Sequence, residues 1–125
     1  MGRSGSEAVI VCKRIYEPPS ATDGYRVLVD RLWPRGVKRE EAAIDEWLKD
    51  LAPSSELRRF AAADPSKWPE FERRYRAELS QPHLQPELAR IRKIARSKTV
   101  TLLYAKRDEQ HNNAVVLKEV LDEGR

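Results

Sequence analysis

Cysteine and histidine are scarce in this chain of 125 residues, which has one cysteine, Cys12, and two histidines, His83 and His111. A single cysteine excludes an internal disulfide and a metal site built from several thiolates. Two histidines far apart in the sequence argue against a structural zinc site. A carboxylate-bound Mg²⁺ stays open, but no cluster of carboxylates calls for one. We therefore predict no metal and no cofactor.

Long apolar runs are also missing. No run approaches the roughly 20 residues that cross a membrane, and Met1–Ser6 contains no apolar signal core. The sequence predicts a cytoplasmic protein that does not bind membranes, with a flexible tail over residues 1–7 and a single domain over residues 8–125. A glycine-rich phosphate loop, a His-Glu-x-x-His motif and a Gly-x-Ser-x-Gly motif are absent as well, so none of these motifs identifies a reaction.

Positive charge is present but unevenly distributed. The net charge is +4, and the whole excess lies in residues 58–98, which hold 11 basic and 5 acidic side chains. A basic region of this kind suits an anionic partner, and it equally suits solubility without any partner.

Three apolar segments predict the strands of a buried sheet. They lie at residues 9–16, 25–30 and 99–105, and the second and third have continuously apolar centres, which is typical of strands covered on both faces. A long helical stretch joins the second to the third, so we expect these two to be parallel with a right-handed connection. The direction of the first stays open. An antiparallel hairpin is the statistical default, but the eight-residue link after it could span about 26 Å and run back along the strand.

Five helical segments are predicted around these strands. The first is indicated by an apolar stripe with helical spacing, formed by Ile44, Trp47, Leu48 and Leu51. The second begins at Ser54 or Ser55, the third begins at Asp64-Pro65, the fourth begins near Pro86, and the last follows the third strand. Residues that these later helices should bury are Leu57, Phe60, Trp68, Phe71, Tyr75, Leu79, Leu88, Ile91, Ala95, Leu117, Val120 and Leu121. The fold class is therefore α/β, with a small, mostly parallel sheet of three or four strands covered by about five helices in a three-layer-like domain.

Polar residues cluster where the second and third strands end. In a parallel sheet, ligands bind beyond the carboxyl ends of the strands, so the two clusters should meet in space. The second strand is followed by Asp30, Arg31 and Arg35, and the third by Tyr104, Lys106, Arg107, Asp108, His111, Asn112 and Asn113.

His111 is the candidate acid or base in this cluster, because imidazole can gain or lose a proton near neutral pH. Asp108 or Asp30 would orient it, and Tyr104 lies close enough in sequence to take part. Structural interpretations remain open beside this one. Asp30 and Arg31 could form an ion pair, and Asp108 could simply cap the last helix.

The string Asp30-Arg31-Leu32-Trp33-Pro34-Arg35-Gly36 is specific, and it is accompanied by others: Lys13–Tyr16, Gly24–Val29, Asp64-Pro65 with Trp68, Arg74-Tyr75, and Leu102–Leu117 with His111-Asn112-Asn113-Ala114. Together they resemble the YeaO-like branch of a bacterial family known only as a domain of unknown function. The resemblance covers residues 9–121. It implies an α/β domain with parallel strands, Asp30 and Arg31 at one strand end, and no assigned activity. It also favours a parallel first strand, which would bring Lys13, Arg14 and Tyr16 to the same edge.

The chain departs from the family pattern at two places. Related members often carry Gly-His-Asp-Pro where this chain has Ala62-Ala63-Asp64-Pro65, so a second site histidine is lost. The wider family often carries a cysteine at the start of the last helix, where this chain has His111-Asn112-Asn113. Thiol chemistry is therefore not available at that point.

Two functional hypotheses follow. In the first, the protein is a small enzyme or degenerate enzyme that binds an anionic, phosphate-bearing small molecule. The anion would be held by Arg31, Arg35 and Arg107 through planar contacts, with Arg14, Asn112 and the start of the last helix nearby. In the second, the basic helical middle, with Arg92, Lys93 and Arg96, binds nucleic acid or another protein. The sequence leaves the oligomeric state open.

Overall fold

The computed structural model describes residues 9–62 and 64–124, so the predicted tail over residues 1–7 lies outside the described part. The chain forms a four-stranded sheet with the order β1-β4-β2-β3, in which all neighbouring strands are parallel. The strands are β1 (Ile10–Arg14), β2 (Tyr25–Leu28), β3 (Glu46–Trp47) and β4 (Val100–Tyr104). The prediction of an α/β fold with a mostly parallel sheet is confirmed. The first strand runs parallel to β4, as the family resemblance implied.

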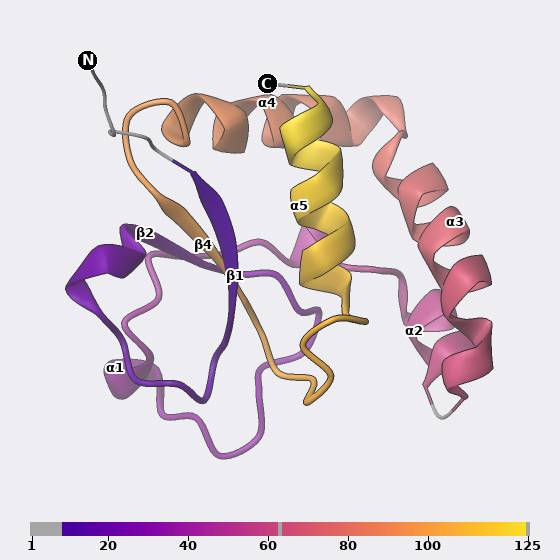
Figure 1. Ribbon diagram of the computed structural model, residues 1–125, viewed down its shortest axis with the longest axis horizontal. Coiled ribbons are helices and arrows are strands. Elements are labelled where there is room, and N and C mark those ends of the chain that lie inside the picture. Colours follow the sequence, from indigo (N-terminus) through magenta and orange to yellow (C-terminus); the bar gives the residue numbers. More distant parts are fainter. Residues whose placement is uncertain (1–8, 63, 125) are drawn as a thin grey trace.

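Five α-helices lie within the described residues: α1 (Arg39–Ala42), α2 (Ser55–Ala61), α3 (Trp68–Leu79), α4 (Gln85–Ile94) and α5 (Asn113–Glu123). The predicted helix start at Ser54 is confirmed, because its hydroxyl accepts from the Leu57 N–H at 3.1 Å. The Asp64 carboxylate accepts from the Ser66 N–H at 3.0 Å and caps a 3-10 turn, Pro65–Lys67, which leads into α3 at Trp68. Figure 1 shows α5 alongside β1 and β4, α3 beyond it, and α4 across the amino-end side of the sheet. None of the described helices has the length and apolarity needed to cross a bilayer.

The two faces of the sheet are covered unequally. Because side chains alternate along a strand, Val27 and Leu102 belong to the large core beneath α2–α5, whereas Leu28 and Leu103 face the other way. In the described part of the chain, that second face is covered by α1, by the irregular chain around it, which includes Trp33, and by Trp47 of β3. Trp33 and Trp47 contact each other edge to face, with ring centroids 5.4 Å apart.

The helix predicted over residues 44–51 is wrong. This segment instead contains β3 and a short 3-10 turn, Lys49–Leu51. The backbone joins the edge of the sheet, because the Leu48 N–H donates to the Leu28 carbonyl at 2.8 Å. The apolar stripe is divided between the two cores: Ile44 and Trp47 pack in the smaller one, and Leu48 and Leu51 in the larger. The same spacing of apolar residues that would form one face of a helix here places side chains in the cores on opposite sides of the sheet.

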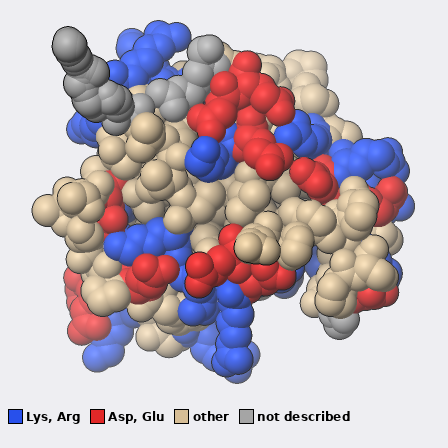
Figure 2. Space-filling model, in the orientation of Figure 1, with Lys and Arg blue, Asp and Glu red and all other residues tan. Residues whose placement is uncertain are grey.

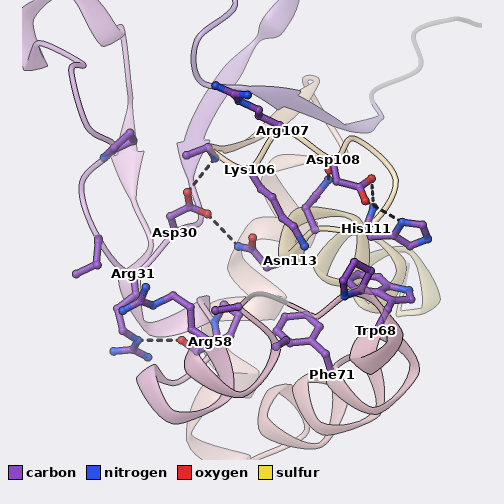
Figure 3. Close-up of a pocket in the computed structure, with 18 of the residues that line it drawn as sticks. Asp30, Arg31, Arg58, Trp68, Phe71, Lys106, Arg107, Asp108, His111 and Asn113 are labelled. Carbon is purple, nitrogen blue, oxygen red and sulfur yellow. Dashed lines mark hydrogen bonds and ion pairs between the residues drawn. The ribbon is translucent and has the colours of Figure 1, made fainter.

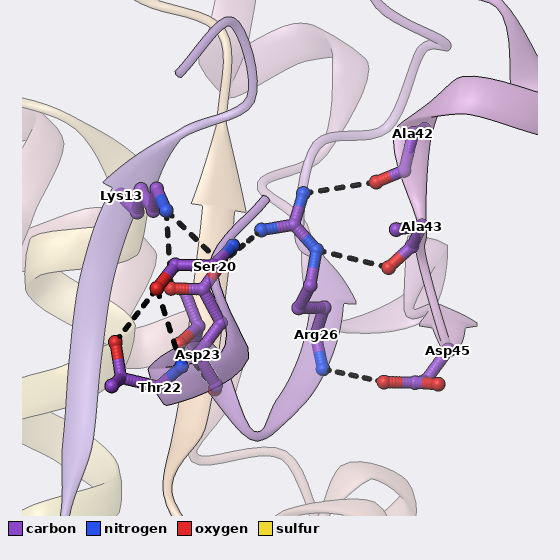
Figure 4. A network of polar contacts seen from close by, with 9 residues as sticks. Lys13, Ser20, Thr22, Asp23, Arg26, Ala42, Ala43 and Asp45 are labelled. Carbon is purple, nitrogen blue, oxygen red and sulfur yellow. Dashed lines mark hydrogen bonds and ion pairs between the residues drawn. The ribbon is translucent and has the colours of Figure 1, made fainter. Parts of the chain in front are cut away.

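A buried ionic network fixes the connection between β1 and β2 (Figure 4). Asp23, at the end of a 3-10 turn, pairs with Arg26 and, at 3.0 Å, with Lys13 of β1. The Arg26 guanidinium also donates to the carbonyls of Ala42 and Ala43, both at 2.9 Å. The network therefore ties the β1–β2 connection to the end of α1, and it leaves the opposite ends of the strands free to form a site.

Candidate functional site

A cavity of about 760 Å³ lies beyond the carboxyl ends of β2 and β4, with α2 and α3 forming its other wall (Figure 3). The segments that follow the two strands therefore meet in space. The cavity is lined by Asp30, Arg31, Leu32, Trp33, Pro34, Pro53, Arg58, Ala61, Ala62, Asp64, Pro65, Trp68, Phe71, Ala105, Lys106, Arg107, Asp108, His111, Asn112 and Asn113.

Asp30 links the ends of the two central strands. One carboxylate oxygen accepts from the Ala105 N–H at 2.9 Å, and the other accepts from the Asn113 side-chain amide at 3.2 Å (Figure 3). Burial raises the pKa of the Asp30 carboxyl, and it outweighs the lowering caused by the hydrogen bonds of Asn113 and Ala105 and by the charge of Arg58.

The neighbouring Arg31 turns away from Asp30. Its Nε donates to the Pro53 carbonyl at 2.9 Å, and its Nη2 lies 3.5 Å from the Ala52 carbonyl. Within residues 9–62 and 64–124 no ion pair joins Asp30 to Arg31, so the ion pair considered from the sequence is not formed. Arg31 lines the cavity, but its guanidinium ties the strand end to the segment before α2.

Asp108 and His111 form an exposed pair at the rim. The Asp108 carboxylate accepts from the N–H groups of Gln110 at 2.9 Å and His111 at 3.0 Å, and it contacts His111 Nδ1 at 3.0 Å. These hydrogen bonds lower the pKa of Asp108 to about 2. The other side of the imidazole lies edge to face against Trp68, with ring centroids 5.1 Å apart.

The interpretation of Asp108 as the cap of the last helix is wrong. Asn112 caps α5, because its side-chain oxygen accepts from the Val115 N–H at 3.0 Å while its amide donates to the Asp108 carbonyl at 2.9 Å. Asn112 is 1% exposed. Its polar groups are thus used within the turn that presents His111.

Three predicted site residues lie outside the cavity lining. Tyr104 lies on the same face of β4 as Leu102, and it is therefore buried in the large core. Burial raises the pKa of the Tyr104 hydroxyl. Arg14 donates to the carbonyls of Ala105 and Lys106, both at 3.0 Å, and so supports the turn from behind. Arg35 is exposed, and its carbonyl accepts from the Tyr16 hydroxyl at 2.9 Å.

The helical wall contributes residues that sequence reasoning missed as site residues. Arg58 of α2 lines the cavity, and Trp68 and Phe71 of α3 stack with ring centroids 5.4 Å apart. Trp68 was expected to be largely buried, but it is only partly so because it lies on the cavity wall. A helical spacing indicates which residues face inward. It does not indicate that Trp68, at the start of α3, borders a cavity instead of packing fully in the core.

The basic middle region is largely occupied by contacts within the protein. Arg92 donates to the carbonyls of Leu121 and Val120, both at 3.0 Å, and Arg76 pairs with Glu119 at 2.9 Å. On the face shown in Figure 2, basic and acidic side chains are interspersed. Lys93 and Arg96 are exposed, and a role for them in nucleic-acid binding stays a prediction.

A family model described as "Inactive DUF488-N3 subclade" matches residues 9–124. The chain belongs to this subclade. It is 46% identical to the uncharacterized protein YeaO of Escherichia coli strain K12, over 90% of this chain and 96% of YeaO. It is 39% identical to the uncharacterized protein Rv3073c of Mycobacterium tuberculosis strain H37Rv and to the uncharacterized protein Mb3100c of Mycobacterium bovis, over 87% of this chain and 90% of each relative. No solved structure matches the chain significantly.

The resemblance to the YeaO-like branch is thus confirmed, and the subclade match includes every residue that lines the cavity. Ala62 and Asp64 stand on the cavity wall, where DUF488 relatives were expected to carry a histidine between them. Ala63 itself lies outside the described residues. Among the described residues, no group of three or more histidine, cysteine or acidic side chains is placed to hold a metal ion.

Proposed function

We propose that this domain is a degenerate enzyme that binds a small anionic, phosphate-bearing molecule in the cavity at the carboxyl ends of β2 and β4. The observation that carries the proposal is a set of three cationic side chains at the cavity, those of Arg58, Lys106 and Arg107. Within the described part of the chain, none of the three has a hydrogen-bond or ion-pair partner. The Lys106 ammonium lies over the Trp68 ring, 5.8 Å from its centroid. Cations without an oxygen acceptor in the protein are suited to bind a phosphate or carboxylate.

Two of the three acidic residues that line the cavity, Asp64 and Asp108, do not cancel this preference. Asp64 accepts hydrogen bonds from the N–H of Ser66 at 3.0 Å and from its hydroxyl at 2.7 Å. Asp108 is held by the backbone N–H groups of Gln110 and His111. These carboxylates already have donors in the protein, whereas Arg58, Lys106 and Arg107 have no acceptor among the described residues. The imbalance favours an anionic ligand.

Size and apolar lining favour a small molecule with an apolar part. The cavity volume of about 760 Å³ falls within the roughly 300–1,000 Å³ of typical ligand sites. The stacked rings of Trp68 and Phe71 offer an apolar wall to an aromatic or aliphatic group. The description of the subclade as inactive supports binding without turnover.

Titration calorimetry with 4-methylphenyl phosphate tests the proposal. The wild-type protein should bind it more tightly than 4-methylphenol or inorganic phosphate at matched ionic strength. Lys106→Ala and Arg58→Ala should each weaken binding by about tenfold, because each removes a charge-assisted contact. Arg96→Ala, which removes an exposed cation from the end of α4, is the matched control.

The proposal is wrong if the wild-type protein does not bind the phosphate ester, or if it binds 4-methylphenol equally well. Equal weakening by Arg96→Ala would mean that the charge effect is long-range rather than local. Release of inorganic phosphate from the ester, lost in His111→Ala, would show an active enzyme instead of a degenerate one.

A further inference from the structure

We propose that the ligand of this cavity also carries an ammonium group, which binds the carboxylate of Asp30, so that the ligand is zwitterionic. This inference rests on the proposed function, because it concerns the same cavity. It comes from a different observation, however: the partners of Asp30 leave part of its carboxylate unused.

The hydrogen bonds of Asp30 account for only part of its accepting capacity. A carboxylate can accept about four hydrogen bonds, and the described residues supply two donors, Ala105 and Asn113. The Asn113 side-chain nitrogen has two N–H groups, and it donates to the Val29 carbonyl at 2.8 Å and to Asp30 at 3.2 Å. Each Asp30 oxygen therefore has one donor among the described residues and can accept another.

Among residues 9–62 and 64–124, no cation donates a hydrogen bond to this carboxylate. Arg31 is turned to the carbonyls of Pro53 and Ala52. Arg58 acts on Asp30 only through its charge at longer range, without a hydrogen bond among the described residues. In Figure 3, Asp30 and Asn113 lie between Lys106 on one side and Arg58 and Phe71 on the other. A ligand bound in this space would lie beside Asp30 and beside the cations that line the same cavity.

A structural role does not require the negative charge of Asp30. The bond from the Ala105 N–H fixes the end of β4 to the end of β2, and an asparagine could accept it equally well. A negative charge removed from water needs a partner of opposite charge or a proton. The raised pKa of Asp30 agrees with a carboxylate that lacks such a partner in the free protein.

Three phosphate esters that differ only in the group opposite the phosphate test this inference: 4-methylphenyl, 4-(hydroxymethyl)phenyl and 4-(aminomethyl)phenyl phosphate. The aminomethyl ester should bind the wild-type protein at least about tenfold more tightly than the methyl ester, because it adds a charge-assisted hydrogen bond. Asp30→Asn should remove this preference, so that the aminomethyl and methyl esters bind the variant with affinities within about twofold of each other. Asp50→Asn, which removes an exposed carboxylate outside the cavity lining, should keep the preference.

The outcomes separate the two proposals. If the methyl ester binds but the aminomethyl ester binds no more tightly, the inference is overturned while the proposed function stands. A preference for the hydroxymethyl ester over both others would also overturn it, in favour of a neutral donor. If no ester binds, the proposed function itself fails. Should Asp30→Asn not fold, the comparison of the three esters on the wild-type protein still decides the question.

Discussion

At the scale of single residues, some side chains at the strand ends hold the backbone in place, and others are available to bind a ligand. The guanidinium groups of Arg14 and Arg31 donate to backbone carbonyls. The Asn112 side chain donates to the Asp108 carbonyl and accepts from the Val115 N–H. Lys106 and Arg107 follow the same strand but reach no acceptor within the described chain. Residue type alone does not separate these roles, because a guanidinium can serve either a carbonyl or an anion.

The raised pKa of Asp30 predicts a specific dependence of stability on pH. Between the unfolded pKa of about 4 and the higher folded pKa, the folded state holds more protons than the unfolded state. The contribution of Asp30 to the free energy of unfolding is therefore complete below about pH 4 and is lost as the pH rises through the folded value.

Urea denaturation of the wild-type protein and of Asp30→Asn at several pH values between about 4 and 7 measures this contribution. The wild-type free energy of unfolding, relative to that of the variant, should fall as the pH rises. A difference that stays constant, or that rises with pH, would show that the carboxylate is not perturbed by burial. Asp50→Asn gives the baseline for an exposed carboxylate.

At the scale of elements, α5 depends on contacts at both of its ends. Asn112 satisfies the first turn, and Arg92 of α4 reaches the carbonyls of Val120 and Leu121 in the last turn. The last four carbonyls of a helix lack the usual donor one turn ahead; Arg92 supplies donors to two of them, and Leu121 also accepts from the Gly124 N–H at 3.3 Å. The helix packs against β1 and β4, and it begins at the cavity. By holding the last turn of α5, Arg92 therefore helps to fix the position of the residues at its first turn.

Arg92→Ala should therefore lower the free energy of unfolding by about 1–2 kcal/mol, as expected for partly exposed hydrogen bonds from a charged donor. Amide hydrogen exchange in residues 120–124 should also become faster. Lys93→Ala, which removes the exposed neighbouring charge, should change stability by less than about 0.5 kcal/mol. Equal effects of the two variants would mean that the basic surface, rather than the helix end, determines the change.

Helices with clear start signals could be predicted from the sequence, and the segment at residues 44–51 could not. Ser54 caps α2, and Asp64 caps the 3-10 turn that leads into α3, through local hydrogen bonds that are encoded within three residues. The backbone conformation at Trp47 and Leu48 depends on pairing with the edge of β2, which is distant in sequence. Local spacing therefore favoured a helix, and a tertiary backbone pairing overrode it.

At the scale of the whole molecule, the cavity exists because three separated segments meet. Two of them, after β2 and after β4, could be predicted, because parallel strands present their carboxyl ends at one edge. The third, from α2 to Phe71 of α3, could not, because helical spacing does not specify how two helices dock. For this reason the sequence indicated Arg31 and Arg107 but missed Arg58.

This construction predicts that ligand binding stabilises the folded protein, because the unfolded chain holds no cavity. With 4-methylphenyl phosphate at a hundredfold excess over its dissociation constant, the free energy of unfolding should rise by about 2.7 kcal/mol, measured by urea denaturation. Lys106→Ala should reduce this gain at the same ligand concentration, since its affinity is lower, whereas Arg96→Ala should retain it in full. Sodium chloride at matched ionic strength should give no comparable rise. If chloride stabilises the protein as much as the ester does, the three cations respond to screening alone, and the cavity does not bind anions specifically.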